Sequence, residues 1–255
     1  MALLKVENLS KSFSGLKAVS NVDLEIKEGE LVGLIGPNGA GKTTVFNLLT
    51  GVYEPTEGTI IFKGQKINGL APYKISHRGI ARTFQNIRLF GDLSVIDNVK
   101  IAYHQHVSYN ILSGILRLPN YYKGEKEIYQ KAYDLLKIFD LHEKENELAK
   151  NLPYGQQRRL EIARALATKP SLLLLDEPAA GMNPQETQNL MDLIRWIRKE
   201  FDLTILLIEH DMSLVMGICE RIYVLDYGMI IAHGTPDEIK SNPRVIEAYL
   251  GEEAG

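Results

Sequence analysis

The sequence predicts an α/β fold, in which a core built on a mainly parallel sheet is interrupted by an inserted helical segment. Three short, almost wholly apolar runs at residues 31–35, 172–175 and 205–208 are typical of parallel strands that are buried on both faces. Between about residues 84 and 168 the strand signals fade and apolar residues recur at helical spacing. The chain has 255 residues, of which 45 % are hydrophobic and 24 % are charged, as expected of a globular protein with a sizeable core.

The N-terminal part of the chain predicts antiparallel β structure beside this core. Val22, Leu24 and Ile26 alternate with charged residues, which is the pattern of a half-exposed strand, and a turn follows at residues 28–30. The apolar strand at 31–35 comes next and leads through a glycine-rich loop into a helix.

The middle of the chain predicts a helical subdomain. Ile128, Ala132, Leu135, Leu136 and Phe139 fall on one face of a helix, with lysines and glutamates opposite. We therefore divide the chain into a core, residues 1–85 and 170–255, and a helical subdomain, residues 86–169.

The core elements resume after the helical segment. An amphipathic helix is predicted over residues 190–201, and strands at 222–225 and 229–232 pair across a glycine turn. Thr235 and Asn242 each precede a proline, which is the pattern of a helix N-cap followed by proline at the first helical position. Two short helices are therefore expected to close the chain.

Composition and charge argue against several classes of protein. The net charge of −3 provides no general basic field for nucleic acid. The single cysteine, Cys219, cannot form an internal disulfide and fits a reducing compartment. No run approaches the roughly 18–20 apolar residues of a membrane span, and the first seven residues lack the basic and apolar regions of a signal peptide. We expect a soluble, cytoplasmic chain.

Residues 36–43, Gly-Pro-Asn-Gly-Ala-Gly-Lys-Thr, match the phosphate-loop (P-loop) pattern G-x-x-x-x-G-K-[ST] in full. The loop lies between a strand and a helix, where curled backbone amides and the helix N-terminus can bind phosphate oxygens. Lys42 is expected to reach the β- and γ-phosphates, and the Thr43 hydroxyl to ligate Mg²⁺. The alternative is a glycine-rich turn without a ligand. The predicted nucleotide-binding residues of this loop are Gly36, Pro37, Asn38, Gly39, Ala40, Gly41, Lys42, Thr43 and Thr44.

Two adjacent carboxylates, Asp176 and Glu177, follow the apolar strand at 172–175. Mg²⁺ prefers oxygen ligands, and hydrolysis needs a base that accepts a proton from water. Asp176 is predicted to bind the metal and Glu177 to act as the general base. A polar strand end without function is the alternative, but the upstream phosphate loop favours the functional interpretation.

Four further motifs occur at spacings that separate the classes of nucleotide hydrolase. They are Gln85 after Ala-Arg-Thr-Phe, the segment Leu-Pro-Tyr-Gly-Gln-Gln-Arg-Arg at 152–159, Gly-Met-Asn-Pro at 181–184 and Ile-Glu-His-Asp at 208–211. With these motifs the sequence resembles the ATP-binding-cassette (ABC) ATPases over essentially its whole length. The stretches at 80–88, 103–106, 216–224 and 245–252 make it most similar to the ATPases of branched-chain amino acid importers, specifically the larger of the two ATPase subunits.

The resemblance implies roles for residues outside the phosphate loop. Phe13 would stack on the adenine ring, and Gln85 would sense Mg²⁺ and the γ-phosphate. His210 would contact the γ-phosphate and hold the attacking water. Gly155 and Gln156, in the signature segment, would complete the nucleotide site of another cassette. The catalytic set is then Glu177, His210 and Gln85, and the metal-binding set is Thr43, Gln85 and Asp176.

Three residues depart from the family pattern. Pro153 stands where a serine usually offers its hydroxyl, and proline has no backbone N–H to donate. Tyr154 replaces the first glycine of the signature segment. Asn183 replaces a common aspartate, and its amide can still form hydrogen bonds without carrying a charge.

The resemblance also implies partners and a location. Two ATPase chains, identical or related, would sandwich two ATP molecules head to tail. The pair would sit on the inner face of the cell membrane against two integral membrane permease subunits, with an extracytoplasmic substrate-binding protein as an indirect partner and no nucleic acid.

Two other functions remain as alternatives to import of branched-chain amino acids. A soluble ABC-type switch acting on nucleic acid or the ribosome would predict duplicated cassettes, a coiled-coil insertion or a basic patch, none of which this sequence carries. A phosphate-loop kinase lacks a recognisable acceptor pocket or lid motif here and conflicts with the Gly155-Gln156 motif.

Residues 101–116 carry no formal charge apart from histidines, so we expect either helical core or a surface, including Tyr103, Tyr109 and Ile111, that docks a membrane subunit. Arg117 follows this stretch. His104 and His106 are spaced for one face of a strand and are interpreted as surface residues rather than metal ligands.

Overall fold

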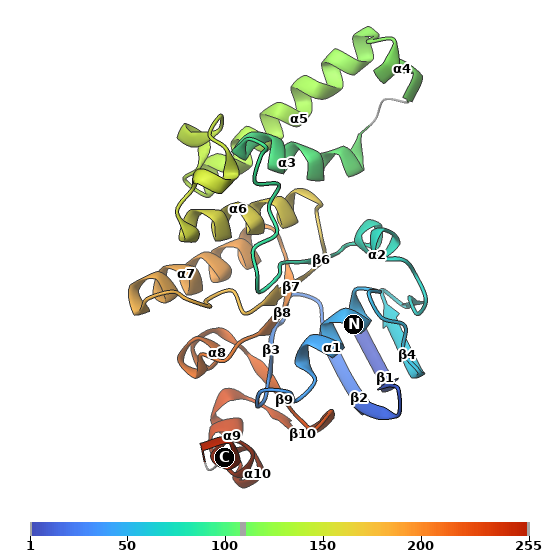
Figure 1. Cartoon of the computed structure of the whole chain (residues 1–255), viewed down its shortest axis with the longest axis vertical. Helices are drawn as coiled ribbons and strands as arrows, with labels where there is room; N and C mark the ends of the chain where they lie inside the picture. The colour runs from blue at the N-terminus through green and yellow to red at the C-terminus, as the bar shows by residue number, and fades with distance from the viewer. Residues whose placement is uncertain (1, 108–110, 254–255) are drawn as a thin grey trace. The chain divides into compact units, whose positions relative to one another are not determined.

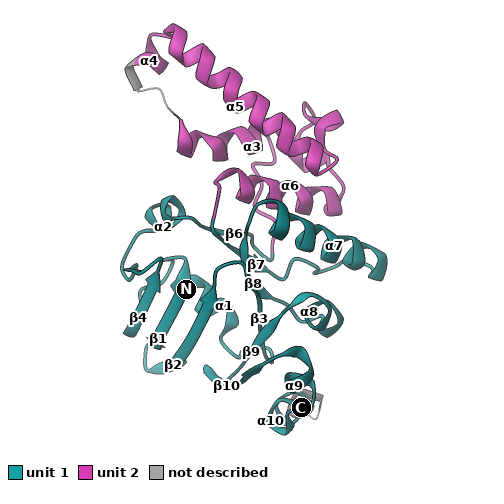
Figure 2. Ribbon diagram, turned by 180° about the vertical axis from the view of Figure 1, so that it is seen from behind, with its two compact units in different colours: residues 1–85, 171–255 teal, residues 86–170 magenta. Residues whose placement is uncertain are grey.

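The computed structural model describes residues 2–107 and 111–253 (Figure 1). They form two compact units, which comprise residues 1–85 with 171–255 and residues 86–170 (Figure 2). Pro170, which the sequence placed in the core, belongs to the helical unit. The core resumes at Ser171, because its amide donates to the carbonyl of Gly79 at 2.8 Å.

The larger sheet of the first unit has six strands in the order β10-β9-β3-β8-β7-β6, all parallel except β10. Every residue of β3, β7 and β8 is buried, which confirms the expectation from their apolar sequences. The bounds are β3 Leu31–Ile35, β6 Ile80–Arg82, β7 Leu172–Asp176, β8 Thr204–Ile208, β9 Arg221–Asp226 and β10 Met229–Gly234.

The smaller sheet is antiparallel, with the order β2-β1-β4-β5, as the N-terminal alternation predicted. Val22, Leu24 and Ile26 of β2 are buried in a core that the two sheets share with helix α1. The bounds are β1 Ala2–Phe13, β2 Leu16–Lys27, β4 Glu57–Phe62 and β5 Gln65–Lys66.

Helices of the first unit begin where the sequence supplies start signals. Thr235 caps α9 in a capping box with Glu238, and Pro236 occupies the first helical position, as predicted. These helices are α1 Lys42–Leu49, α2 Pro72–Arg78, α7 Pro184–Glu200, α8 Met212–Ile218, α9 Pro236–Lys240 and α10 Pro243–Glu253.

The second unit is helical throughout its described part. Its longest helix, α5, buries Ile128, Ala132, Leu135 and Leu136 on one face, which confirms the predicted pattern. The helices are α3 Val95–Tyr103, α4 Ile111–Ile115, α5 Pro119–Ile138 and α6 Tyr154–Ala167, with short 3₁₀ turns at His104–His106, His142–Lys144 and Ala149–Asn151.

His104 and His106 are surface residues, as predicted, although their spacing suited a strand and no strand carries them. Both histidines lie in the 3₁₀ turn that continues α3, because the helical backbone of that element extends to residue 106. Both are exposed, and His104 Nε2 lies 3.5 Å from a carboxylate oxygen of Glu125. Tyr109, one of the residues expected to dock a membrane subunit, lies outside the described residues.

No helix in the described ranges combines the length and the apolar character that crossing a bilayer requires.

The departure at Asn183 has a local structural role. Asn183 caps α7: its Oδ1 accepts from the amide of Glu186 at 2.9 Å, and a Glu186 carboxylate oxygen accepts from the Asn183 amide at 2.9 Å. This reciprocal pair fixes the point at which the loop after Glu177 becomes helix.

We expect Asn183→Ala to lower the free energy of unfolding by about 1 kcal/mol, because it removes the N-cap acceptor. Asn183→Asp should retain the stability of the unchanged chain, since aspartate caps helices as well as asparagine does. Urea unfolding followed by circular dichroism measures both. An equal loss in the two variants would contradict the capping role.

The lone cysteine is packed in the core beneath β3. Cys219 is 6 % exposed, and a β-carbon built on Gly33 would lie 3.1 Å from its Sγ. Burial, with a smaller contribution from Glu220, raises the pKa of the thiol to about 12. The thiolate is the form that reacts with alkylating reagents. Cys219 is therefore unreactive for two reasons: reagents cannot reach it, and its thiol stays protonated.

We therefore expect N-ethylmaleimide to modify the folded protein about a hundredfold more slowly than the chain in concentrated guanidinium. Mass spectrometry of the alkylated protein over time gives both rates. Equal rates in the two conditions would show that Cys219 is not enclosed as described.

Candidate functional site

Three parallel strands bring the predicted site residues to one edge of the larger sheet. Leu34 of β3 pairs with Ile208 of β8, and Ile208 also pairs with Asp176 of β7. The segments that follow these strands are the phosphate loop, Glu177 with its loop, and Glu209 with His210. Carboxyl ends of parallel strands form the usual ligand-binding edge of such sheets.

The backbone of the phosphate loop requires glycine at two positions. Gly36 has φ 151°, and a β-carbon there would lie 1.9 Å from the carbonyl oxygen of Leu225. Gly41 has φ 105°, and a β-carbon would lie 2.7 Å from the carbonyl oxygen of Ala18. The loop is thus held against its neighbours in a conformation that leaves no room for side chains at these points.

Lys42 lies inside the curl of the loop. Its side chain is buried, and its ammonium donates to the carbonyls of Gly36 at 2.6 Å and Pro37 at 2.8 Å. Helix α1 begins at this residue, and its N-cap, Gly41, provides no side-chain cap to the first amides. A positive charge and a helix N-terminus therefore meet at one place, which suits an anion.

Asp176 is paired with a residue for which the sequence suggested no role. Its Oδ2 accepts from Arg82 at 2.6 Å, and both side chains are almost fully buried. Arg82 also donates to Asn47 Oδ1 at 2.7 Å, and its Cζ lies 5.4 Å from the ring centroid of Phe46 and 5.0 Å from that of Phe84. The only sequence signal was a basic residue at the end of β6, three residues before Gln85.

Glu177 and His210 are in contact. Glu177 Oε1 lies 2.6 Å from His210 Nε2, and the histidine side chain is 43 % exposed while that of Glu177 is 12 % exposed. Glu177 has φ 46°, a left-handed backbone conformation that costs a non-glycine residue on the order of 1–3 kcal/mol. The structure thus brings together two residues that are 33 positions apart in the chain.

A second acid that the sequence interpretation missed, Glu209, directly precedes His210. It is 3 % exposed and accepts hydrogen bonds from the amides of Ala179, His210 and Asp211. Burial raises the pKa of its carboxyl, more than the three amides lower it. The sequence feature that could have indicated Glu209 is its position directly after a buried apolar strand.

The other predicted residues of the first unit occupy its surface. The ring of Phe13, at the end of β1, is 38 % exposed and makes an edge contact with Tyr53 at 5.1 Å between centroids. Gln85 is exposed, three residues beyond the end of β6.

The signature segment begins helix α6 in the helical unit. Pro153 is the N-cap, and its carbonyl accepts from the amides of both Gln156 and Gln157 at 2.9 Å. The Tyr154 hydroxyl accepts from Arg158 at 3.2 Å, and Arg158 forms a fully buried ion pair with Glu161 at 2.7 Å. Tyr154 is therefore tied to its own helix by a contact that glycine could not make.

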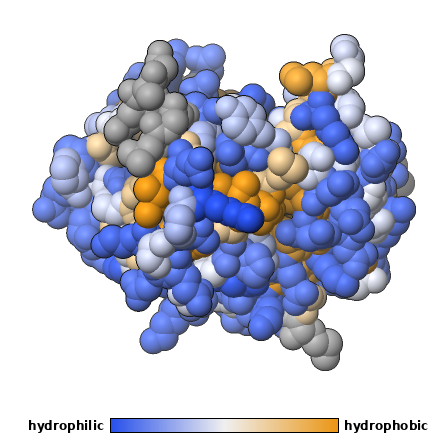
Figure 3. Space-filling model, turned by 90° about the horizontal axis from the view of Figure 1, so that it is seen from below, coloured by the Kyte–Doolittle hydropathy of each residue, from blue (hydrophilic) through white to orange (hydrophobic). Residues whose placement is uncertain are grey.

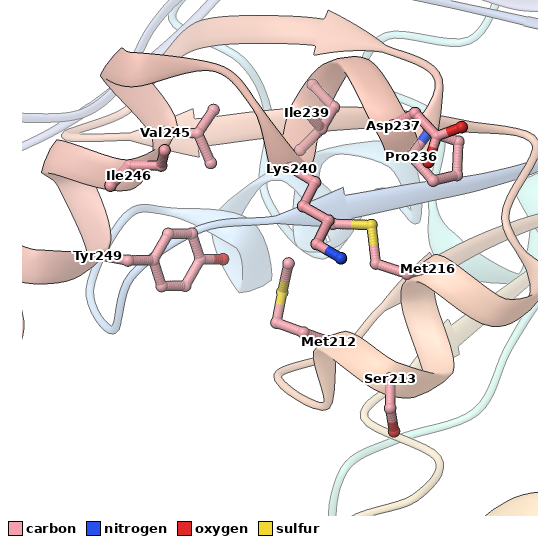
Figure 4. A pocket seen from close by; sticks show the side chains of 10 residues that line it. All are labelled: Met212, Ser213, Met216, Pro236, Asp237, Ile239, Lys240, Val245, Ile246 and Tyr249. Carbon is pink, nitrogen blue, oxygen red and sulfur yellow. The ribbon is translucent and has the colours of Figure 1, made fainter.

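The first unit contains two further cavities. One of about 690 Å³ borders residues 37–40 and is flanked by Arg244 and Glu247 of α10. The other, of about 570 Å³, lies between α8, α9 and α10 (Figure 4). A view from below shows hydrophobic residues gathered within a mostly hydrophilic surface (Figure 3). The second is lined by Met212, Ser213, Met216, Pro236, Asp237, Ile239, Lys240, Val245, Ile246 and Tyr249, all outside the predicted site.

Comparison with known proteins agrees with this geometry. Residues 19–180 match the ABC transporter family, and residues 229–255 match a family described as branched-chain amino acid ATP-binding cassette transporter. The chain is 52 % identical over 98 % of both chains to the high-affinity branched-chain amino acid transport ATP-binding protein LivG of Escherichia coli (strain K12).

Solved structures support the same assignment. The ADP conformation of MJ1267, an ATP-binding cassette of an ABC transporter, matches with a TM-score of 0.85 at 31 % identity, over 98 % of this chain and 99 % of that one. A dimeric post-hydrolysis state of the cassette MJ0796, bound to ADP and phosphate, matches with a TM-score of 0.78 at 28 % identity, over 91 % and 98 %. The chain belongs to the ABC transporter family and is an ABC-type ATPase with a P-loop fold.

Proposed function

We propose that this chain binds ATP with Mg²⁺ and hydrolyses it to power an importer of branched-chain amino acids. The observation that carries the catalytic part is the contact of Glu177 with His210 at the sheet edge where the phosphate loop begins. The transported substrate is inferred from the name of LivG, to which the chain is 52 % identical, and from the family match at residues 229–255.

The phosphate loop and Lys42 bind the phosphates of the nucleotide. The ammonium now donates to two carbonyls of its own loop, so it is already desolvated and aimed into the curl. When the β- and γ-phosphates enter, they replace these carbonyls as acceptors, because phosphate oxygens carry a negative charge that the carbonyl oxygens lack. Thr43 and Thr44 lie in the first turn of α1, whose N-terminus completes the anion site.

Mg²⁺ fits the oxygen atoms available at this edge. Thr43, Gln85 and Asp176 supply hydroxyl, amide and carboxylate oxygens, the donors that this cation prefers. Arg82 engages Oδ2 of Asp176, which leaves Oδ1 for a cation. The described residues contain no group of three His, Cys, Asp or Glu that could hold a metal alone, so phosphates would complete the coordination. The bound cation would offset charge on the phosphates.

Glu177 is the general base in this proposal. Its carboxylate can accept the proton of a water that attacks the γ-phosphate, and the half-exposed side chain of His210 holds that carboxylate at 2.6 Å. The left-handed backbone conformation of Glu177 sets the direction in which its side chain leaves the loop. The half-exposed ring of Phe13 offers a flat surface for adenine.

A second cassette would complete the site. In a head-to-tail pair, Gly155, Gln156 and the start of α6 would face the γ-phosphate held by the other chain. The match to a dimeric cassette supports this arrangement. Two membrane permease subunits and, through them, an extracytoplasmic binding protein are the remaining partners. They place the chain on the inner face of the membrane.

Glu177→Gln tests the catalytic assignment. We expect turnover to fall by at least about a hundredfold, because the amide cannot accept a proton from water. ATP affinity should change by less than about threefold, since the phosphate loop is untouched. Phosphate release and equilibrium binding of a fluorescent ATP analogue measure the two quantities. Lys42→Ala serves as the converse control and should weaken binding itself.

A Glu177→Gln variant that hydrolyses ATP at a rate near that of the unchanged chain would remove Glu177 from the base role. Unchanged ATP affinity in Lys42→Ala would show that the phosphate loop has been misassigned.

Pro153→Ser, made in the Glu177→Gln background, tests the departure in the signature segment. A serine hydroxyl facing the partner's γ-phosphate adds a bond to a charged group, worth about 1.5–3 kcal/mol or roughly ten- to a hundredfold in the dimerisation constant. Sedimentation velocity at several ATP concentrations measures the constant.

The change in stability of this variant should be small. Loss of the proline costs about 0.4–1 kcal/mol through the unfolded chain, while serine at the N-cap of α6 contributes a comparable gain. Dimerisation no tighter than in the Pro153 protein would indicate that the Gly155 amide and the helix end already supply the needed donors.

A further inference from the structure

We propose that Glu209 is a positioning residue that holds the loop of Glu177 and the loop of His210 together as one unit. The proposal rests on the catalytic roles proposed above for Glu177 and His210. Glu209 does not face the nucleotide edge itself: it is 3 % exposed and its carboxylate is surrounded by backbone amides.

Each oxygen of the Glu209 carboxylate bonds a different loop. Oε1 accepts from the amide of Ala179 at 2.7 Å, two residues after Glu177. Oε2 accepts from the amides of His210 at 2.9 Å and Asp211 at 3.4 Å. The side chain therefore bridges the segments that follow β7 and β8.

The bridge acts where the two strands no longer pair. The ladder between β7 and β8 ends at Asp176 and Ile208, and one further backbone bond joins the Glu177 amide to the Ile208 carbonyl at 2.9 Å. Beyond that point, Glu209 links the loop after β7 to the loop after β8, and the side chains of Glu177 and His210 on these loops form the short contact. A contact of 2.6 Å between side chains on separate loops needs both loops to be fixed.

The carboxylate is required, rather than any polar group, because it accepts on both oxygens. A glutamine of the same size can accept on one oxygen only, and its amide group would turn an N–H toward another N–H. One of the two loops would then lose its bond. Burying a carboxylate is unfavourable, as the raised pKa of Glu209 shows. A neutral residue would fill the site without this cost.

The experiment compares Glu209→Gln with a matched control on the same strand. Thr204, at the start of β8, is buried, and its hydroxyl accepts from the amide of Gly29 at 2.9 Å. Thr204→Val removes a similar buried acceptor at the opposite end of β8, so both variants should lose some thermal stability. Steady-state kinetics and histidine-selective ¹³C NMR are measured on the full chain, with His210→Ala identifying the resonance of His210.

We expect Glu209→Gln to lower kcat at least about tenfold while KM for ATP stays within about twofold, because a displaced base affects the chemical step and not the phosphate loop. The ring resonance of His210 should shift toward that of an exposed histidine. Thr204→Val should leave kcat and the resonance unchanged. If Glu209→Gln gives no folded protein, Glu209→Asp, which keeps both acceptors on a shorter side chain, should show the same fall in kcat to a smaller degree.

A fall in stability with kcat and the His210 resonance unchanged would overturn the proposal and leave Glu209 a purely structural residue. Glu177→Gln, prepared and assayed in the same way, distinguishes failure of the positioning role from failure of the proposed catalytic function. If Glu177→Gln stops turnover and Glu209→Gln does not, only the positioning role fails. If Glu177→Gln does not stop turnover, the proposed catalytic function itself fails.

Discussion

The register of three parallel strands is the constraint on which the site depends. β3, β8 and β7 pair so that Leu34, Ile208 and Asp176 lie side by side; β7 and β8 end there, and β3 ends one residue later. The phosphate loop, the acid pair Asp176-Glu177 and the segment Glu209-His210 follow at once. A shift of one residue would turn the side chains of that strand to the other face of the sheet. The fully buried, apolar strands make such a shift costly, because both faces are packed.

Charged groups that the sheet buries at this edge are each matched by a partner. Lys42 donates to loop carbonyls, Asp176 pairs with Arg82, and Glu209 accepts from three amides. Removing one partner of such a group leaves a buried charge, which is strongly destabilising. Apart from the Lys42 ammonium, which exchanges its carbonyl partners for phosphates, these groups are in place before the nucleotide binds, and little reorganisation is needed during the reaction.

The sequence predicted the parts of this arrangement that depend on local pattern. Apolar runs indicated β3, β7 and β8, and the spacing of the glycines with Lys42 indicated the phosphate loop. It did not predict Arg82 or Glu209, because their partners lie far along the chain and no periodicity marks such contacts. Asn183 and Tyr154 were recognised only as departures, since a cap and a bond to Arg158 require the helix ends to be known. The spacing of His104 and His106 fitted a strand, but α3 continues into a 3₁₀ turn there.

The most direct measurement of the central claim is a crystal structure of the chain with Mg²⁺ and a non-hydrolysable ATP analogue. The account predicts phosphates in the loop at residues 36–43, with the Lys42 ammonium moved from the carbonyls of Gly36 and Pro37 to the β- and γ-phosphates. It also predicts the γ-phosphate facing Glu177 and His210. A structure in which Lys42 keeps its carbonyl partners, or in which the phosphates lie away from the ends of β3, β7 and β8, would contradict it.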